Sequence, residues 1–72
     1  MRLFLTFGTT HGALRAERIL RDAGLASEVV PKPAAIRGAC GLAVRLRAEC
    51  RDTALRALAA ARHPPRQQAL LP

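Results

Sequence analysis

Apolar and polar residues alternate in two short segments of the chain, residues 2–7 and 42–47. A period of two is typical of a strand with one buried face. The inward positions of the two segments are Leu3, Leu5, Phe7, Leu42, Val44 and Leu46. Residues 27–30 are a short strand candidate, which we expect to end at Pro31 because proline has no N–H to donate to a ladder.

Two other segments carry apolar residues at helical spacing. The first follows Thr9 and Thr10, either of which can cap a helix, and it ends before Gly24, which suits the left-handed position after a helix. Its apolar stripe comprises Ala13, Leu14, Ala16, Ile19, Leu20 and Ala23. The second predicted helix covers residues 52–62, is rich in alanine, and is broken by His63-Pro64-Pro65.

The order of these elements is strand, helix, strand, strand, helix, with residues 66–72 forming either a last edge strand or a frayed end. This order predicts an α+β fold, the ferredoxin-like split βαβ sandwich. A right-handed crossover makes the first two strands parallel, with the third inserted antiparallel between them and both helices on one face of a mixed sheet. We expect residues 1–63 to form one domain and residues 64–72 to be a C-terminal tail or edge strand.

The other face of the sheet is expected to be open. Its positions are Phe4, Thr6, Ala43, Arg45 and Arg47. An exposed face with one phenylalanine and several arginines suits a partner or a homodimer, although solvated sheet faces are equally ordinary in small domains.

Composition adds a strong basic bias. The chain has 72 residues and a net charge of +7, with 12 Lys and Arg residues against 5 Asp and Glu residues, and every basic residue except Lys32 is arginine. The charge permits binding to nucleic acid or an acidic partner. Only Phe4 and Phe7 are aromatic, so the chain offers few side chains on which bases could stack. We therefore interpret the positive charge as a bias of the overall composition rather than a sign of nucleic-acid binding. Nucleic acid is therefore not expected as a partner.

No segment predicts a membrane partner or a secreted protein. There is no run of roughly 18 apolar residues, and the first residues have no secretory pattern. We expect a cytoplasmic protein in which both cysteines, Cys40 and Cys50, are free thiols.

Two prolines, two glycines and one cysteine are concentrated between residues 31 and 42. In the predicted topology the third strand begins where the first one ends, so Cys40 is expected beside residues 8–11, at the start of the first helix. A helix N-terminus favours the thiolate over the thiol. His11 is then a candidate base or ion-pair partner, and Thr9 and Thr10 are candidate hydroxyl donors.

The loop glycines Gly38 and Gly41 would let the backbone approach closely around this thiol. The alternative is a buried, structural Cys40, since free cysteine is often a small hydrophobic residue. Cys50 is expected to be a packed thiol, and one His and one Cys do not make a zinc site. No metal and no cofactor are predicted.

Two segments of the chain resemble a small bacterial family called putative selenium/sulfur carrier-like proteins. The first segment is residues 6–17, which read TFGTTHGALRAE, and the second is Pro31-Lys32-Pro33 with residues 38–45, which read GACGLAVR. The resemblance covers roughly residues 2–62 and includes the size and the order of elements. The two motifs together are much more specific than either alone.

The resemblance implies that Cys40 carries sulfur or selenium as a persulfide or selenopersulfide, with Pro33 and Gly41 shaping its loop and His11 as a neighbour. It implies a carrier rather than an enzyme, with donor and acceptor proteins as partners, such as a selenophosphate-forming enzyme. Family loops carry an arginine shortly after the second proline, where this chain has Ala34 and Ala35; Arg37 is the substitute. The competing hypothesis is a non-catalytic ferredoxin-like binding or regulatory module in which Cys40 is structural.

Overall fold

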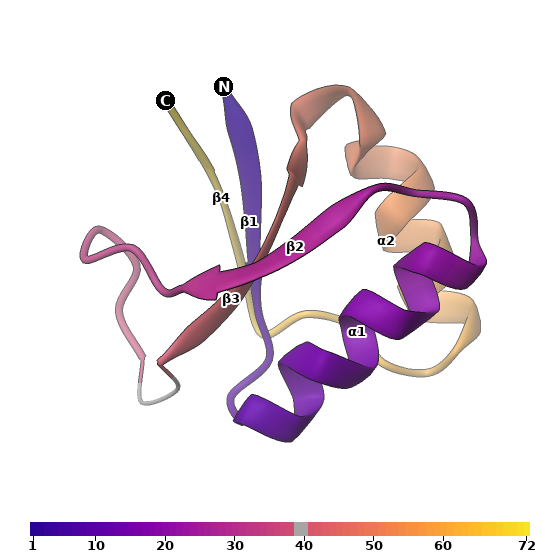
Figure 1. Cartoon of the computed structure of the whole chain (residues 1–72), viewed down its shortest axis with the longest axis horizontal. Coiled ribbons are helices and arrows are strands. Elements are labelled where there is room, and N and C mark those ends of the chain that lie inside the picture. The colour runs from indigo at the N-terminus through magenta and orange to yellow at the C-terminus, as the bar shows by residue number, and fades with distance from the viewer. Residues whose placement is uncertain (39–40) are drawn as a thin grey trace.

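The computed structural model describes residues 1–38 and 41–72 of the chain. Strands and helices follow one another in the predicted order, and residues 67–71 form the final strand at the sheet edge (Figure 1). The elements are β1 (Arg2–Thr6), α1 (Thr10–Asp22), β2 (Ser27–Pro31), β3 (Leu42–Arg47), the 3-10 helix η1 (Ala48–Cys50), α2 (Arg51–Ala60) and β4 (Gln67–Leu71). Within the described residues, neither helix has the length and apolar character needed to cross a membrane.

The four strands form one sheet in the order β2-β3-β1-β4, the arrangement of a ferredoxin-like fold. β3 is antiparallel to both β1 and β2, so β1 and β2 are parallel with β3 between them, as the right-handed crossover predicted. The register pairs Leu5 with Val44 and Thr6 with Gln67. The last residues of β1 and the first residues of β3 and β4 therefore meet at one end of the sheet (Figure 1).

The main core lies between the sheet and the two helices. It comprises Leu3, Leu5, Val44 and Leu46 from the sheet, Ala13, Ala16 and Leu20 from α1, and Ala54 and Leu58 from α2. Each of these side chains is at most 1% exposed. Phe7 and Leu42 pack at the margin, so all six predicted inward positions of the sheet face the helices. The alanines add little apolar area each, but their small size lets the helices lie close to the strands.

Both ends of α1 follow local rules. The Thr9 hydroxyl accepts a hydrogen bond from the Gly12 N–H at 2.9 Å, which makes Thr9 the N-cap. Gly24 has a φ of 84°, and Leu25 N–H donates to Leu20 O at 2.9 Å, the pattern that closes a helix on a left-handed residue. Leu14 was expected in the apolar stripe, but it is 51% exposed.

The end of α2 repeats this pattern with a non-glycine residue. We expected a helix over residues 52–62, whereas α2 covers Arg51–Ala60 and follows η1 directly. Arg62 has a φ of 56°, and His63 N–H donates to Leu58 O at 2.9 Å. The helix thus ends before the His63-Pro64-Pro65 break, because Arg62 adopts the left-handed conformation that Gly24 adopts after α1.

The second face of the sheet is not open as expected. Phe4 is 8% exposed and Ala43 is fully buried, because Ile36 from the loop after β2 folds back over them and is itself 4% exposed. Val30, Ala69 and Leu71 pack around this small second cluster. The prediction of an exposed partner surface at Phe4 is therefore wrong, since the loop supplies an apolar side chain to cover it.

Candidate functional site

The candidate site lies at the end of the sheet where β1 finishes and β3 and β4 begin. Gly8 follows β1 there, and Gly41 precedes β3. The N–H of Lys32 donates to Gly41 O at 2.8 Å, which joins the two ends of the β2–β3 loop. Cys40, the predicted reactive residue, lies outside the described residues together with Ala39. Gly38 and Gly41 are the described residues nearest to it in sequence.

The N-terminus of α1 opens at this end of the sheet. Its first turn contains no acidic residue, so the partial positive charge of the helix end is not compensated from within the helix. The cap Thr9 and the first helical residue Thr10 are both exposed. The Thr9 hydroxyl is engaged with Gly12 N–H, so its proton remains available to donate to a neighbour.

Arg66 adds a full positive charge beside the helix start. The backbone N–H of Arg66 donates to Thr6 O at 2.6 Å, which holds the beginning of β4 against the end of β1. The guanidinium crosses Gly8, where a Cβ atom would come within 2.8 Å of Arg66 Nη1. Gly8 also has a φ of 79°, a left-handed conformation that favours glycine, and a side chain there would displace the end of the Arg66 side chain. The sequence interpretation placed Arg66 in a C-terminal tail or edge strand and missed this position.

The loop that carries Cys40 in the sequence is anchored at several points before residue 38. The Lys32 ammonium donates to Ile36 O, and Ile36 N–H donates to Pro33 O at 3.0 Å. Gln67 Nε2 donates to Arg37 O at 2.6 Å, which ties the loop to the start of β4. Arg37 is exposed, and the structure places it next to β4 in the fold.

Both predicted loop glycines, Gly38 and Gly41, belong to the described part of the chain. Gly38 has a φ of 150°, a backbone conformation that side-chain-bearing residues rarely adopt. Gly41 is exposed, and a Cβ atom there would meet no other atom within 4 Å among the described residues. Both glycines lie on the surface, so the chain on either side of the undescribed pair is accessible to a partner.

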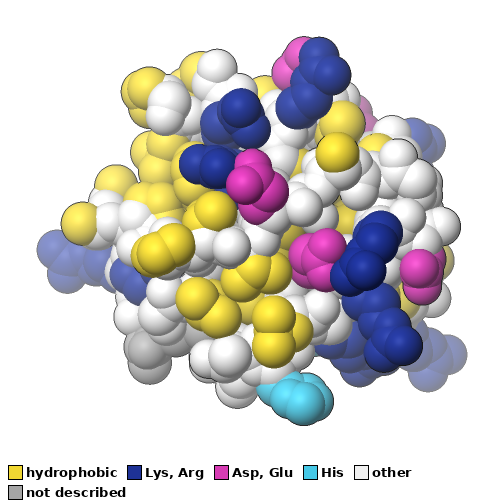
Figure 2. Space-filling model, viewed as in Figure 1, with side chains coloured by type: hydrophobic (Ala, Val, Ile, Leu, Met, Phe, Trp, Pro, Cys, Tyr) yellow, Lys and Arg dark blue, Asp and Glu magenta, His cyan; other side chains and the backbone are white. Residues whose placement is uncertain are grey.

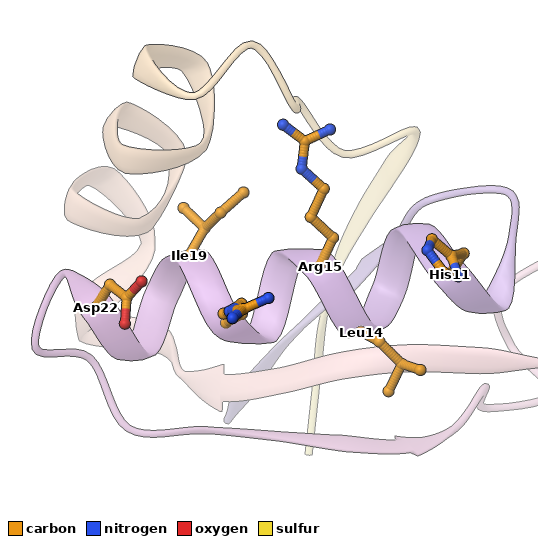
Figure 3. Close-up of a pocket in the computed structure, with 6 residues that line it drawn as sticks. His11, Leu14, Arg15, Ile19 and Asp22 are labelled. Atoms are coloured by element: carbon orange, nitrogen blue, oxygen red, sulfur yellow. The ribbon is translucent and has the colours of Figure 1, made fainter.

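His11 lies on the outer surface of α1. It lines a shallow hollow of about 430 Å³ that follows the helix, and Figure 3 shows His11 at the N-terminal end of α1 and Asp22 at the other. The remaining lining residues are Leu14, Arg15, Arg18 and Ile19. The predicted pairing of His11 with Cys40 involves an undescribed residue and stays a prediction.

His63 is the histidine that the fold uses near the site. Its Nε2 lies 2.8 Å from Gly12 O, and because a carbonyl oxygen only accepts, this nitrogen is the donor. Its ring stacks on Phe7 with the centroids 5.0 Å apart and the planes 9° from parallel. His63 thereby fastens the segment after α2 to the first turn of α1. Its place just before the helix-breaking pair Pro64-Pro65 gave no hint of this contact.

Basic side chains are distributed rather than gathered on the visible face. Figure 2 shows them at several separate places with acidic side chains between them. Among the described residues, arginines pair with carboxylates in Arg21–Glu17, Arg45–Glu28, Arg47–Glu49 and Arg51–Asp52. The hydrogen bond from Arg45, aided by its charge, lowers the pKa of Glu28.

The second thiol, Cys50, is far from the candidate site in the fold. It belongs to η1, just before α2, and its half-buried side chain packs against the main core. η1 follows the end of β3, whereas the candidate site lies at the beginning of that strand. The packed position agrees with the prediction for Cys50.

Comparison with known proteins identifies the family. A model of the family described as "Putative Se/S carrier protein-like" matches residues 2–68, nearly the whole chain. No curated protein and no solved structure matches the chain. On this match, the chain belongs to the Se/S carrier protein-like family.

Proposed function

We propose that the protein carries one sulfur or selenium atom on the Cys40 thiol, as a persulfide or selenopersulfide, from a donor enzyme to an acceptor. The observation that carries the proposal is the family match over residues 2–68, which includes Cys40. The geometry of the described residues around that end of the sheet supports it, because it meets the chemical needs of an atom carrier.

The first need is a thiolate, which is the nucleophilic form of cysteine. In the transfer step, the Cys40 thiolate attacks the outer sulfur of the donor's persulfide. A new bond forms from Cys40 to that sulfur, the bond to the donor cysteine breaks, and the donor leaves as its own thiolate, so no oxidant is consumed. The uncompensated N-terminus of α1 and the Arg66 guanidinium supply positive charge to this end of the sheet.

The second need is access for two partners in turn. Arg37, Gly38 and Gly41 are exposed, so the described part of this loop lies on the surface. The third need is a loop that keeps its place while it is exposed. The hydrogen bonds of Lys32 N–H to Gly41 O and of Gln67 to Arg37 O, together with buried Ile36, provide that anchoring.

The direct test is the intact mass of the protein purified without reductant from its native host. We expect a fraction heavier by one sulfur or one selenium atom, which is lost on treatment with dithiothreitol. Cys40→Ser should remove the heavier species completely. Cys50→Ser is the matched control, because Cys50 packs against the core at the other end of β3, and it should retain the adduct.

An adduct that persists in Cys40→Ser would contradict the proposal. A bare mass in wild type, with a Cys40 that reacts slowly with iodoacetamide, would also contradict it. That result would favour the binding or regulatory module, in which Cys40 is structural.

A further inference from the structure

The strand β4 is an edge strand with no charged side chain. Its outer side has no neighbouring strand among the described residues, and its sequence from Gln67 to Leu71 is uncharged. The opposite edge, β2, carries Glu28 and Pro31, both of which discourage pairing with another chain. β4 has no such protection, although the protein as a whole carries a charge of +7.

An apolar hollow lies beside this unprotected edge. Leu70 is 46% exposed on the face of β4 that points toward the helices, opposite Leu3 in the register. The hollow has a volume of about 410 Å³ and is lined by Leu3, Arg51, Gln68, Ala69 and Leu70. At its rim, Arg51 Nε donates to Gln68 Oε1 at 2.9 Å, so these two side chains are joined to each other.

We propose that two copies of the chain associate through antiparallel pairing of their β4 strands, which continues the sheet from one copy into the other. The β4 strands of two copies can pair antiparallel about a two-fold axis at Ala69. In the pairing centred there, Ala69 faces its own counterpart and Gln68 faces Leu70 of the second copy. That leucine then lies over the hollow beside Gln68. Like charges directly opposite each other destabilise strand pairs, and this register places none there.

The same features determine the strength of the association and its response to salt. A strand of five residues is about 17 Å long, so the interface falls at the small end of the range for specific complexes and the dimer is weak. Two chains of charge +7 also repel each other. Salt screens this repulsion, so association strengthens as the ionic strength rises. A complex held by attraction between the arginines and an acidic partner would instead weaken as the ionic strength rises.

Sedimentation velocity across a concentration series tests the proposal. We expect the average mass of the wild-type chain to rise from the monomer toward the dimer between about 10 µM and about 1 mM, the range for weak complexes. Leu70→Lys should raise the dissociation constant at least about tenfold, because it puts a charge beside the hollow and protects the edge. Leu14→Lys is the matched control: Leu14 is 51% exposed on α1, and its variant should associate like wild type.

A cross-link tests the register without relying on affinity. Facing Cα atoms in antiparallel strands are about 4.5–5.5 Å apart, within the range that a disulfide spans. Ala69→Cys in a Cys40→Ser, Cys50→Ser background should form a covalent dimer when treated with oxidised glutathione. Leu14→Cys in the same background should remain a monomer.

Three results would overturn the proposal. One is a wild-type chain that stays monomeric at about 1 mM, which would also be the result if β4 accepts a strand only from a different protein. Another is an equal loss of association in Leu70→Lys and Leu14→Lys. The last is equal cross-linking at positions 69 and 14.

Discussion

One apolar side chain, Ile36, packs the loop that precedes Cys40 in the sequence onto the sheet, beside the hydrogen bonds that also anchor it, and truncating that side chain measures how much the apolar contact contributes. Ile36 is 4% exposed and packs on Phe4 and Ala43. Ile36→Ala removes three carbon atoms from this cluster while leaving the turn bond from Ile36 N–H to Pro33 O in place. The variant therefore separates apolar docking from loop conformation.

The expected loss follows from the buried carbon atoms. At about 0.8 kcal/mol for each buried CH₂, three atoms contribute about 2.4 kcal/mol, and an incompletely collapsed cavity adds to this. The total stability of a chain of 72 residues is about 4–11 kcal/mol. The substitution should therefore remove a quarter or more of the free energy of unfolding.

Urea denaturation followed by far-ultraviolet circular dichroism measures this loss. With an m value of about 1–2 kcal/mol per molar urea, the midpoint should fall by roughly 1–2 M. Leu14→Ala is the control, since it removes the same number of carbon atoms from an exposed helical position and should change stability by less than about 0.5 kcal/mol. A change in Ile36→Ala as small as in this control would refute the docking of the loop on the second face of the sheet.

Two further predictions concern local features. Arg62→Gly should stabilise the protein by roughly 0.5–1 kcal/mol in thermal or urea unfolding, because it relieves the left-handed strain at a φ of 56°; Gly24→Ala should destabilise it by about 1 kcal/mol, and opposite signs would contradict the helix-end assignment. The pKa of Glu28 lies below its usual 4.5 because of Arg45, so its stabilising contribution is complete above pH 4.5 and is lost as the pH falls through the lowered pKa. The stability difference between wild type and Glu28→Gln should therefore shrink on acidification, and a constant difference down to pH 2 would contradict the pairing.

Local sequence was sufficient for most of the architecture. Alternation identified β1 and β3 and their inward residues, and helical spacing with Thr9 and Gly24 identified α1 and both its ends. These signals depend on neighbours within a few residues, which is why they can be read from one chain. The split βαβ order then restricted the topology, since crossovers are right-handed. The boundary of α2 was less exact, because Arg62 gave no sign of a left-handed conformation.

Local sequence patterns predicted the candidate site less completely than the fold. The topology correctly placed the beginning of β3 at the end of the sheet where β1 finishes, but the charge that Arg66 adds there comes from a segment that was expected to be either a tail or an edge strand. His63 was likewise assigned no role, although it joins the end of α2 to the first turn of α1. Both contacts join segments that are more than fifty residues apart in sequence, and periodicity carries no information at that distance.

The sequence by itself determined the first three strands, both α-helices, their order and the family, because these depend on local periodicity and on motifs within contiguous segments. The tertiary structure decided which surfaces remain free. Ile36 covers the face of the sheet around Phe4, which alternation alone predicted to be open, and β4 becomes an uncharged edge only because it pairs with β1. Whether a strand face or edge is exposed depends on which distant segment packs against it. That is settled by apolar burial across the whole chain, not by the pattern of any one segment.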